Sequence, residues 1–390
     1  MRVAFLTSHP IQYHANWFRA LAASPGLDLE VLYCHSAGAQ EQADAGFGVA
    51  FTWDRPLLGG YRHTFLRNVS SKPSLSGFGG LDTPEVGERI RNRAYDAVVV
   101  NGWHYKSAWQ GMVNCWRAKV PVLMRSDSHL HTERGVMKRM VKGLPYRAFI
   151  PRLDACLPVG KWSADYFLHY GARPERVHVV PHAIDSSFES EAATLQPERS
   201  ALRDVDGFTE SDVVFLFSGK FIDKKRPLDF VNAVARAHQE DARVTGLMVG
   251  DGPLRGMCES AATQAGAPIR FAGFLNQSEI SRAYVLADAL VLPSDGGETW
   301  GLVVNEAMTC GTPAFVSDRV GCGPDLISDG ETGFVFPMGD VSALAALMVR
   351  TAGDSHGRTL MGCAARQRVE RHSVSRAVAD LRTALERVAQ

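Results

Sequence analysis

The chain has 390 residues, of which 45% are apolar and 22% are charged; this is ordinary for a soluble globular enzyme of two or three domains. Its formal net charge is +0, so the chain lacks the overall basic excess of a protein that coats nucleic acid. It contains no run of about 18 apolar residues, which excludes an obvious membrane-spanning segment.

The seven cysteines are odd in number and include no C-x-x-C pair. We therefore expect reduced, mostly buried thiols rather than a disulfide framework or a cysteine-based zinc site. The first residues, MRVAFLTSHPIQYH, turn polar too soon to resemble a signal peptide. Together these observations predict a cytoplasmic protein.

Short apolar runs alternate with helical patterns through the first half of the chain. Six runs are predicted as strands, at residues 3–7, 29–34, 96–101, 121–126, 155–160 and 177–181. Helical patterns lie between them, at 14–24, 84–94 and 105–118. Several runs are almost wholly apolar, as parallel strands covered on both faces are. The alternation predicts a doubly wound α/β lobe over residues 1–185.

A polar stretch without a clear apolar period follows at 186–212, and we interpret it as a linker and the approach to a second lobe. The alternation of strands and helices then restarts. Six further strands are predicted, at residues 213–220, 244–252, 269–274, 288–294, 313–318 and 332–337. Two α/β sheets of similar size predict two Rossmann-like lobes facing a cleft, the second over 213–370.

Glycine-rich and basic loops follow the predicted strands of the second lobe. SGKFIDKKRP carries Lys220 and Lys225, GDGP ends the next strand, and SDGGETWG precedes a predicted helix. Ligands bind beyond the carboxyl ends of parallel strands. Free N–H groups at a helix start, together with converging lysines, suit a diphosphate. Taken singly, a lysine-rich loop is usually a solvated turn, and GDG is usually only a turn.

Glu306 lies in the apolar middle of a helix predicted from near Thr299 to just before Gly311. A buried carboxylate is costly unless it is paired or hydrogen-bonded. Taken alone, Glu306 is either on the solvated face of an amphipathic helix or part of a site.

The order of the motifs resembles that of the retaining GT-B glycosyltransferases of family 4, the E-x7-E type, which use nucleotide-sugar donors. The resemblance is strongest over 213–340, and residues 306–336 follow the family pattern nearly throughout. The matching residues are Gly219, Lys220 and Lys225 for G-[RK]-x4-K, Gly250 and Gly252 for GDGP, and Glu298 and Glu306 for E-x7-E.

The resemblance implies roles for the donor-side residues. Glu306 would accept hydrogen bonds from the ribose hydroxyls, and Glu298 would hold hydroxyls of the donor sugar. Lys220 and Lys225 would bind the diphosphate and stabilise the charge that builds on it as the leaving group departs.

Backbone N–H groups around Gly301 and Leu302 would add to this site. No cofactor and no metal are expected, because lysines and helix dipoles neutralise the diphosphate in GT-B relatives and the histidines form no metal-binding pair. The resemblance also implies that a C-terminal helix within 371–390 crosses back onto the first lobe.

The first lobe is expected to carry the acceptor. His104 matches a position where the family often has a histidine near the reacting centre; a structural loop histidine is an equal alternative. Asp127 follows another predicted strand and is a further cleft candidate, although a turn aspartate is the simpler interpretation.

The first βα loop departs from the family pattern. Many relatives have a Gly-Gly pair there, and this chain has polar side chains suited to sugar hydroxyls. These acceptor-side candidates are His9, Gln12, Tyr13 and His14.

Residues 133–154 interleave basic and apolar side chains. They could form an interfacial helix that gives a peripheral contact at the inner membrane face, or a helix packed on the first lobe with a solvated basic face.

The resemblance implies transfer of a hexosyl unit from a nucleotide-diphosphate sugar to a hydroxyl of a saccharide or lipid-linked acceptor, in cell-surface polysaccharide or glycoconjugate synthesis, with no nucleic-acid partner. One alternative is a nucleotide-sugar epimerase or hydrolase on the same fold, which would need further acid and base carboxylates in the first lobe. Another is a non-catalytic protein that binds nucleotide-sugar, and the complete set of lysines and glutamates argues against it.

Overall fold

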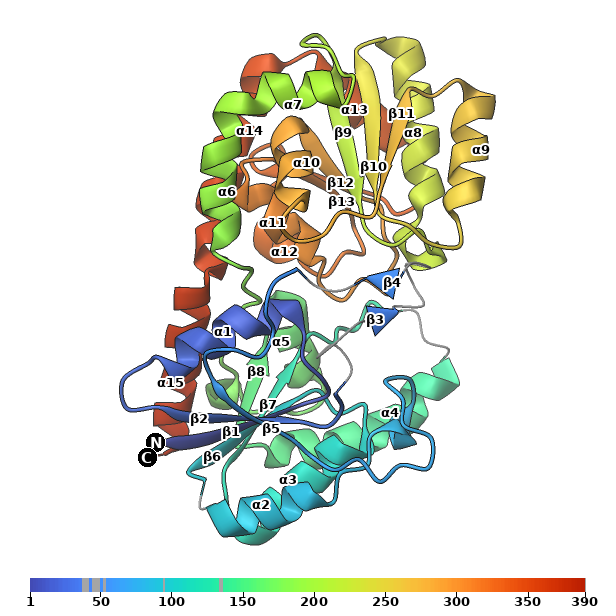
Figure 1. Ribbon diagram of the computed structural model, residues 1–390. Helices are drawn as coiled ribbons and strands as arrows, with labels where there is room; N and C mark the ends of the chain where they lie inside the picture. Colours follow the sequence, from blue (N-terminus) through green and yellow to red (C-terminus); the bar gives the residue numbers. More distant parts are fainter. Residues whose placement is uncertain (37–41, 44–49, 52–53, 94, 133–135, 390) are drawn as a thin grey trace.

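The computed structural model describes residues 1–389 apart from 37–41, 44–49, 52–53, 94 and 133–135. The chain forms two α/β lobes, drawn in Figure 1 with the N-terminal lobe below the C-terminal lobe. Both ends of the chain lie at the N-terminal lobe (Figure 1). The two Rossmann-like lobes predicted from the sequence are therefore present.

The N-terminal sheet has six parallel strands in the order β5-β2-β1-β6-β7-β8. Their bounds are β1 Arg2–Thr7, β2 Asp28–Tyr33, β5 Arg62–Phe65, β6 Ala97–Asn101, β7 Val122–Ser126 and β8 Ala155–Pro158. Its helices are α1 Gln12–Ala22, α2 Glu85–Arg93, α3 Lys106–Ala118, α4 Val136–Phe149 and α5 Lys161–His169. A small antiparallel pair, β3 Gln42–Ala43 and β4 Ala50–Phe51, stands apart from the sheet.

Five of the six strands predicted in the first half are present, and the sixth prediction is wrong. Residues 177–181 run beside β8 but form only one isolated bridge, between Cys156 and Val177. The sixth strand is β5, whose sequence RHTF is partly exposed at the edge of the sheet. An edge strand of this kind carries no apolar run, so hydrophobic periodicity does not find it.

The C-terminal sheet also has six parallel strands, in the order β11-β10-β9-β12-β13-β14. Their bounds are β9 Val213–Ser218, β10 Val244–Val249, β11 Ile269–Gly273, β12 Ala289–Leu292, β13 Ala314–Ser317 and β14 Gly333–Phe336. The surrounding helices are α8 Pro227–Glu240, α9 Arg255–Ala265, α10 Ile280–Leu286, α11 Leu302–Thr309, α12 Gly323–Leu326, α13 Val341–Ala352 and α14 Ser355–Val369. Each strand falls within a predicted run.

Each sheet is buried on both faces. In β1, Val3 and Phe5 pack with α1 on one face, whereas Ala4 and Leu6 belong to the core on the other face. Helices on both sides of a parallel sheet remove both faces from water, which explains why the strands are continuous apolar runs.

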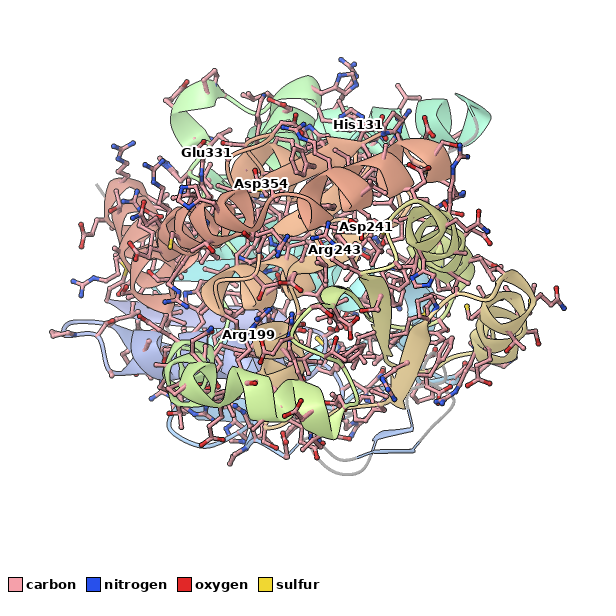
Figure 2. The ribbon with its side chains drawn as sticks, turned by 90° about the horizontal axis from the view of Figure 1, so that it is seen from above. His131, Arg199, Asp241, Arg243, Glu331 and Asp354 are labelled. Carbon is pink, nitrogen blue, oxygen red and sulfur yellow. The ribbon has the colours of Figure 1, made fainter. Side chains whose placement is uncertain are left out.

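The stretch at 186–212 is largely helical rather than an extended linker. It contains α6 (Ser187–Leu195) and α7 (Arg199–Val205), both of which pack against α10 of the C-terminal lobe. Phe188 and Ala192 are buried at a helical spacing of four residues. Arg199, labelled in Figure 2, and Arg203 both form ion pairs with Asp288, at 3.0 and 2.6 Å.

The last helix, α15 (Val374–Val388), lies against the N-terminal lobe. It packs on α1 and β8 and runs beside α1 in Figure 1. Leu381 and Leu385 are buried in the same core as Trp17 and Phe18. The chain therefore crosses between the lobes twice, once before α6 and once before α15.

None of the helices in the described ranges is long and apolar enough to cross a membrane. In α4, Val141 and Leu144 are exposed. The basic residues on which the predicted interfacial face depends, including Lys138, Arg139 and Lys142, have side chains outside the part that the structure describes.

We expect Leu381→Ala to destabilise the protein by about 2–5 kcal/mol, because Leu381 is only 1% exposed in the α1–α15 core and its loss leaves a cavity. Urea unfolding, followed by circular dichroism, measures the loss. Glu386→Ala on the exposed side of α15 is the matched control and should stay within about 0.5 kcal/mol. Equal effects of the two substitutions would show that α15 contributes no core to the N-terminal lobe.

Candidate active site between the lobes

A cavity of about 530 Å³ lies between the two lobes, beyond the carboxyl ends of both sheets. Its lining comes from both lobes: Ser8, Ile11, Tyr13, His14, Asn101, Gly102, His104, Tyr105, Arg125, Ser126, Asp127 and His182 from the first, and Lys225 and residues 298–303 from the second. A smaller pocket of about 100 Å³ adjoins it, and the two share Tyr13 and Val303. Residues from distant parts of the sequence thus line one continuous cleft.

The loops after β9 and β10 touch each other at the floor of the smaller pocket. Gly250 has a φ of 123°, and a Cβ on it would lie 2.0 Å from the carbonyl oxygen of Gly219. No side chain fits there, so the glycine pair keeps the backbone of both loops open to a ligand. Gly219 and Gly250 line this pocket, whereas Gly252, which lies against the backbone of Phe221, does not.

Lys225 and Glu298 form an ion pair in the wall of the larger cavity, through Nζ and Oε2. Burial alone would raise the pKa of Glu298, but Lys225 and then Lys224 hold that pKa below its usual value. The carboxyl group of Glu298 is therefore ionised at neutral pH, and both residues line the cavity. Lys220 is half-buried on the same loop and lines neither pocket.

Helix α11 begins at Leu302, three residues later than predicted, and ends at Thr309. The reason is Gly301, which precedes the helix with a φ of 103°. A Cβ on Gly301 would meet the side chain of Leu292 at 2.8 Å. Glu298 consequently lies in the loop before the helix, and Gly301 and Leu302 line the larger cavity.

Glu306 is on the buried face of α11, with 4% of its surface exposed, so the solvated-face alternative is wrong. Its Oε2 accepts a hydrogen bond of 2.6 Å from the Tyr284 hydroxyl, and the Tyr13 side chain interacts with the same carboxyl group. Burial raises the pKa of Glu306 to about 7 in spite of both tyrosines. Since Tyr13 belongs to α1, this contact joins the two lobes at the smaller pocket.

Two of the acceptor-side candidates lie beside Glu306 rather than in the outer part of the cleft. Gln12 lines the smaller pocket, and Tyr13 lines both pockets. His14 is buried in the wall of the larger cavity, and its Nδ1 has no hydrogen-bond partner. His9 lines neither pocket; its Nδ1 lies 2.9 Å from the Ser8 hydroxyl.

His104 and Asp127 both line the larger cavity from the N-terminal lobe. His104 is exposed to the cleft. Asp127 accepts a hydrogen bond of 2.7 Å from the Thr299 hydroxyl of the C-terminal lobe. Asp127 and Thr299 therefore form a hydrogen bond between the lobes across the larger cavity, in addition to the inter-lobe hydrogen bonds of Lys161 with Asp325 and of Ser278 with Asp54.

The cavity also contains residues that the sequence did not indicate, among them the buried Arg125 and Trp300 and the half-buried His182. Arg125 lies in β7 within an otherwise apolar run, and that lone charge was the available signal. His182 follows the 177–181 segment, and Trp300 was assigned to a helix interior. The rings of His182 and Trp300 are 5.7 Å apart, and both residues line the larger cavity.

Within the described residues, no three His, Cys, Asp or Glu side chains gather closely enough to hold a metal ion. The charged groups of the cleft belong instead to the ion pair of Lys225 with Glu298 and to Arg125, Asp127 and Glu306.

Each lobe matches a model of a glycosyltransferase domain. Residues 12–188 match Glycosyltransferase Family 4, and residues 198–368 match Glycosyl transferases group 1. The chain is 38% identical over 145 residues to sulfoquinovosyl transferase SQD2 of Arabidopsis thaliana, covering 36% of this chain and 27% of that protein. It is 29% identical over 184 residues to N-acetyl-alpha-D-glucosaminyl L-malate synthase of Bacillus anthracis, covering 47% of each. The match thus spans about a quarter of the length of the Arabidopsis protein and about half of the length of the Bacillus protein.

Solved structures share the fold over the whole chain. Anabaena HepE in complex with UDP and glucose has a TM-score of 0.70 at 16% identity, and the match covers 99% of this chain and 100% of that one. A glycosyltransferase from Rickettsia africae has a TM-score of 0.76 at 13% identity, with 100% and 98% covered. The chain therefore has the two-lobe GT-B fold, and the matches to both lobes support a GT-B glycosyltransferase.

We expect the stability of the native protein to fall as the pH rises from about 4.5 to about 7. The pKa of Glu306 is raised from 4.5 to about 7 in the folded protein, so the folded state favours the protonated form and loses that advantage above the raised pKa. The loss is at most roughly 3 kcal/mol. Urea unfolding of the native protein and Glu306→Gln at pH 5 and pH 8 tests this.

The difference between native and Glu306→Gln should change over this range, because the amide cannot ionise. Glu331→Gln removes an exposed glutamate, labelled in Figure 2, and serves as the control. If Glu306→Gln tracks the native protein at both pH values, the carboxyl group of Glu306 does not titrate in this window.

Proposed function

We propose that the protein is a retaining glycosyltransferase that moves a hexosyl unit from a nucleotide-diphosphate sugar to a hydroxyl of a saccharide or lipid-linked acceptor. The observation that carries the proposal is the convergence of Lys225, Glu298 and Glu306 on one cleft between the lobes. The family matches over both lobes support the same class.

In this proposal the smaller pocket receives the nucleoside. Its glycine loops bring the backbone close to the ligand, and the Glu306 carboxylate accepts hydrogen bonds from the ribose hydroxyls. The Tyr13 side chain interacts with Glu306, so ribose has to take the place of that side chain at the carboxylate. Nucleotide binding then replaces this contact between the lobes with contacts of its own.

The diphosphate is assigned to the side of the larger cavity where Lys225 and the start of α11 lie. Free backbone N–H groups at the helix start favour an anion there. As the bond to the sugar breaks, negative charge grows on the diphosphate, and Lys225 stabilises it more in the transition state than in the ground state. Glu298, paired with Lys225, is placed to hold sugar hydroxyls. Lys220 is assigned to the diphosphate through the family pattern.

UDP is the first nucleotide to test, because the fold is shared with a protein solved with UDP and glucose. The acceptor is assigned to the wall formed by the N-terminal lobe, where His14, His104 and Asp127 lie. We place the reaction in the cytoplasm, without a metal or another cofactor, in the synthesis of a cell-surface polysaccharide or glycoconjugate.

Lys225→Ala should lower kcat more than it weakens donor binding, because the charge it stabilises grows during the reaction. Lys224→Ala is the matched comparison. The Lys224 side chain is exposed and does not line the cavity, so this substitution should lower kcat far less. Steady-state kinetics, with the donor found by a thermal-shift screen of nucleotides and nucleotide-sugars, measures both. An unchanged kcat in Lys225→Ala would remove the assigned role.

Glu306→Ala should mainly raise the KM for the donor, by a factor that corresponds to about 1.5–3 kcal/mol for a hydrogen bond to a charged group. Ribose does not change during transfer, so kcat should change little. Glu306→Gln should be milder, since the amide oxygen still accepts a hydrogen bond. A donor KM in Glu306→Ala equal to that of the native protein would contradict the ribose assignment.

The peripheral membrane contact is tested by flotation with anionic liposomes at low salt. If residues 133–154 form an interfacial helix, binding should fall when Lys138, Arg139 and Lys142 are replaced by Glu, because each basic residue near the surface contributes about 1 kcal/mol. Absence of binding by the native protein would eliminate this contact.

A further inference from the structure

Arg125 is buried in the wall of the larger cavity, with 3% of its surface exposed. It lies near the carboxyl end of β7, on the face of the sheet that α1 covers, and its guanidinium is 4.9 Å from the centre of the Trp17 ring. A buried arginine is costly unless its charge is paired and its donors are satisfied.

The hydrogen bonds of Arg125 leave most of its donors unused. Both start at Nη2, and both are long: 3.4 Å to the carbonyl oxygen of Pro181 and 3.4 Å to Nδ1 of His182. Its Nε is buried and has no partner. Within the described part of the chain, no carboxylate lies within ion-pair distance of Arg125, and Asp127 is hydrogen-bonded to Thr299 instead.

Among the described residues, a second buried arginine, Arg203, shows how the fold satisfies such a group when the role is structural. Arg203 is equally buried, and its Nη2 pairs with Asp288 at 2.6 Å. Its Nε and Nη1 donate to the carbonyl oxygens of Leu286 and Asp212, at 2.9 and 3.1 Å. Arg203 faces a packed core, whereas Arg125 faces the cleft.

Arg125 is cationic at neutral pH, and Asp127 attracts it electrostatically without forming an ion pair. Burial lowers the pKa of Arg125 to about 10, which leaves the guanidinium protonated. Burial lowers the pKa of His14 to about 3 and that of His182 well below its usual value, so both imidazoles are neutral. His14 Nδ1, beside Arg125, also lacks a hydrogen-bond partner.

We propose that Arg125 is the recognition residue of a subsite for a carboxylate carried by one of the two substrates of the transfer reaction. The proposal rests on the transferase function proposed above. One guanidinium with an unpaired Nε matches the charge of a monoanion, and its planar fork matches a carboxylate. The diphosphate is assigned across the cavity to Lys225, so the carboxylate belongs to the transferred sugar or to the acceptor.

Two matched pairs of probes separate these sources. UDP-glucuronate and UDP-glucose differ in a carboxylate on the donor sugar, whereas p-nitrophenyl glucuronide and p-nitrophenyl glucoside, offered with saturating UDP, place the same difference on an acceptor. We expect the native protein to bind the acidic member of one pair roughly ten-fold or more tightly by calorimetry, because hydrogen bonds to charged groups are strong. The pair that shows the preference identifies the substrate.

Arg125→Met should abolish that preference while leaving UDP binding unchanged, and Arg125→Lys should retain part of it. Arg125→Met should not lower the melting temperature of the ligand-free protein, since it removes an unpaired buried charge. Arg203→Met is the matched control: it should lower the melting temperature, because it breaks a buried pair.

The subsite is refuted if neither acidic probe binds more tightly than its neutral partner, or if the preference survives in Arg125→Met. It is also refuted if Arg125→Met destabilises the ligand-free protein as much as Arg203→Met does, which would assign Arg125 to the core. The two proposals fail separately. A native protein that binds no nucleotide contradicts the transferase assignment, whereas one that binds UDP and both members of each pair equally contradicts only the subsite.

Discussion

Both sheets are wholly parallel, and this constraint places the chemistry of the molecule. Parallel strands all end at the same edge of a sheet, so the loops that follow them gather there. In this protein the two carboxyl edges face each other across one cleft. Residues as far apart in the sequence as Ser8 and Val303 therefore line the same cavity, although no local motif connects them.

The charged side chains on the two walls of the cleft differ in whether they form ion pairs. On the C-terminal side, Lys225 and Glu298 form an ion pair, so the cation of that wall is held in place. On the N-terminal side, the cation of Arg125 is buried without a carboxylate. Between them, burial raises the pKa of Glu306 to about 7, although two tyrosines act in the opposite direction. Because the Tyr13 side chain interacts with this carboxyl group, lobe contact and the protonation of Glu306 are mutually dependent.

Much of the fold can be predicted from the sequence because buried parallel strands consist of consecutive apolar residues. The edge strand β5 was missed, since its polar sequence RHTF does not need to be buried. The helices at 186–212 were missed because their apolar residues, such as Phe188 and Ala192, are sparse among polar ones. Hydrophobic periodicity identifies a helix or strand that buries many side chains along one face. It is a weak signal for an element that contributes only a few side chains to the core.

The site was less predictable than the fold, and the reason is again physical. Motif spacing indicates which residues of one loop can meet a ligand, as it did for Lys225 and Glu298. It contains no information on contacts between lobes, such as that of Asp127 with Thr299. It also does not show that Gln12 and Tyr13 lie beside Glu306, or that Nε of Arg125 in β7 lacks a hydrogen-bond partner. These features depend on how two separately folded sheets are placed against each other.

The position of α15 has a consequence for the order in which the molecule is made. The face of α1 that holds Trp17 and Phe18 is covered by Leu381 and Leu385. During translation these leucines are synthesised after every strand of both sheets. The N-terminal lobe, although made first, keeps an apolar face open to water until the C-terminal lobe has been produced. Completion of the first lobe therefore has to wait for the synthesis of α15, and a nascent chain stalled before residue 374 would expose a surface prone to aggregation.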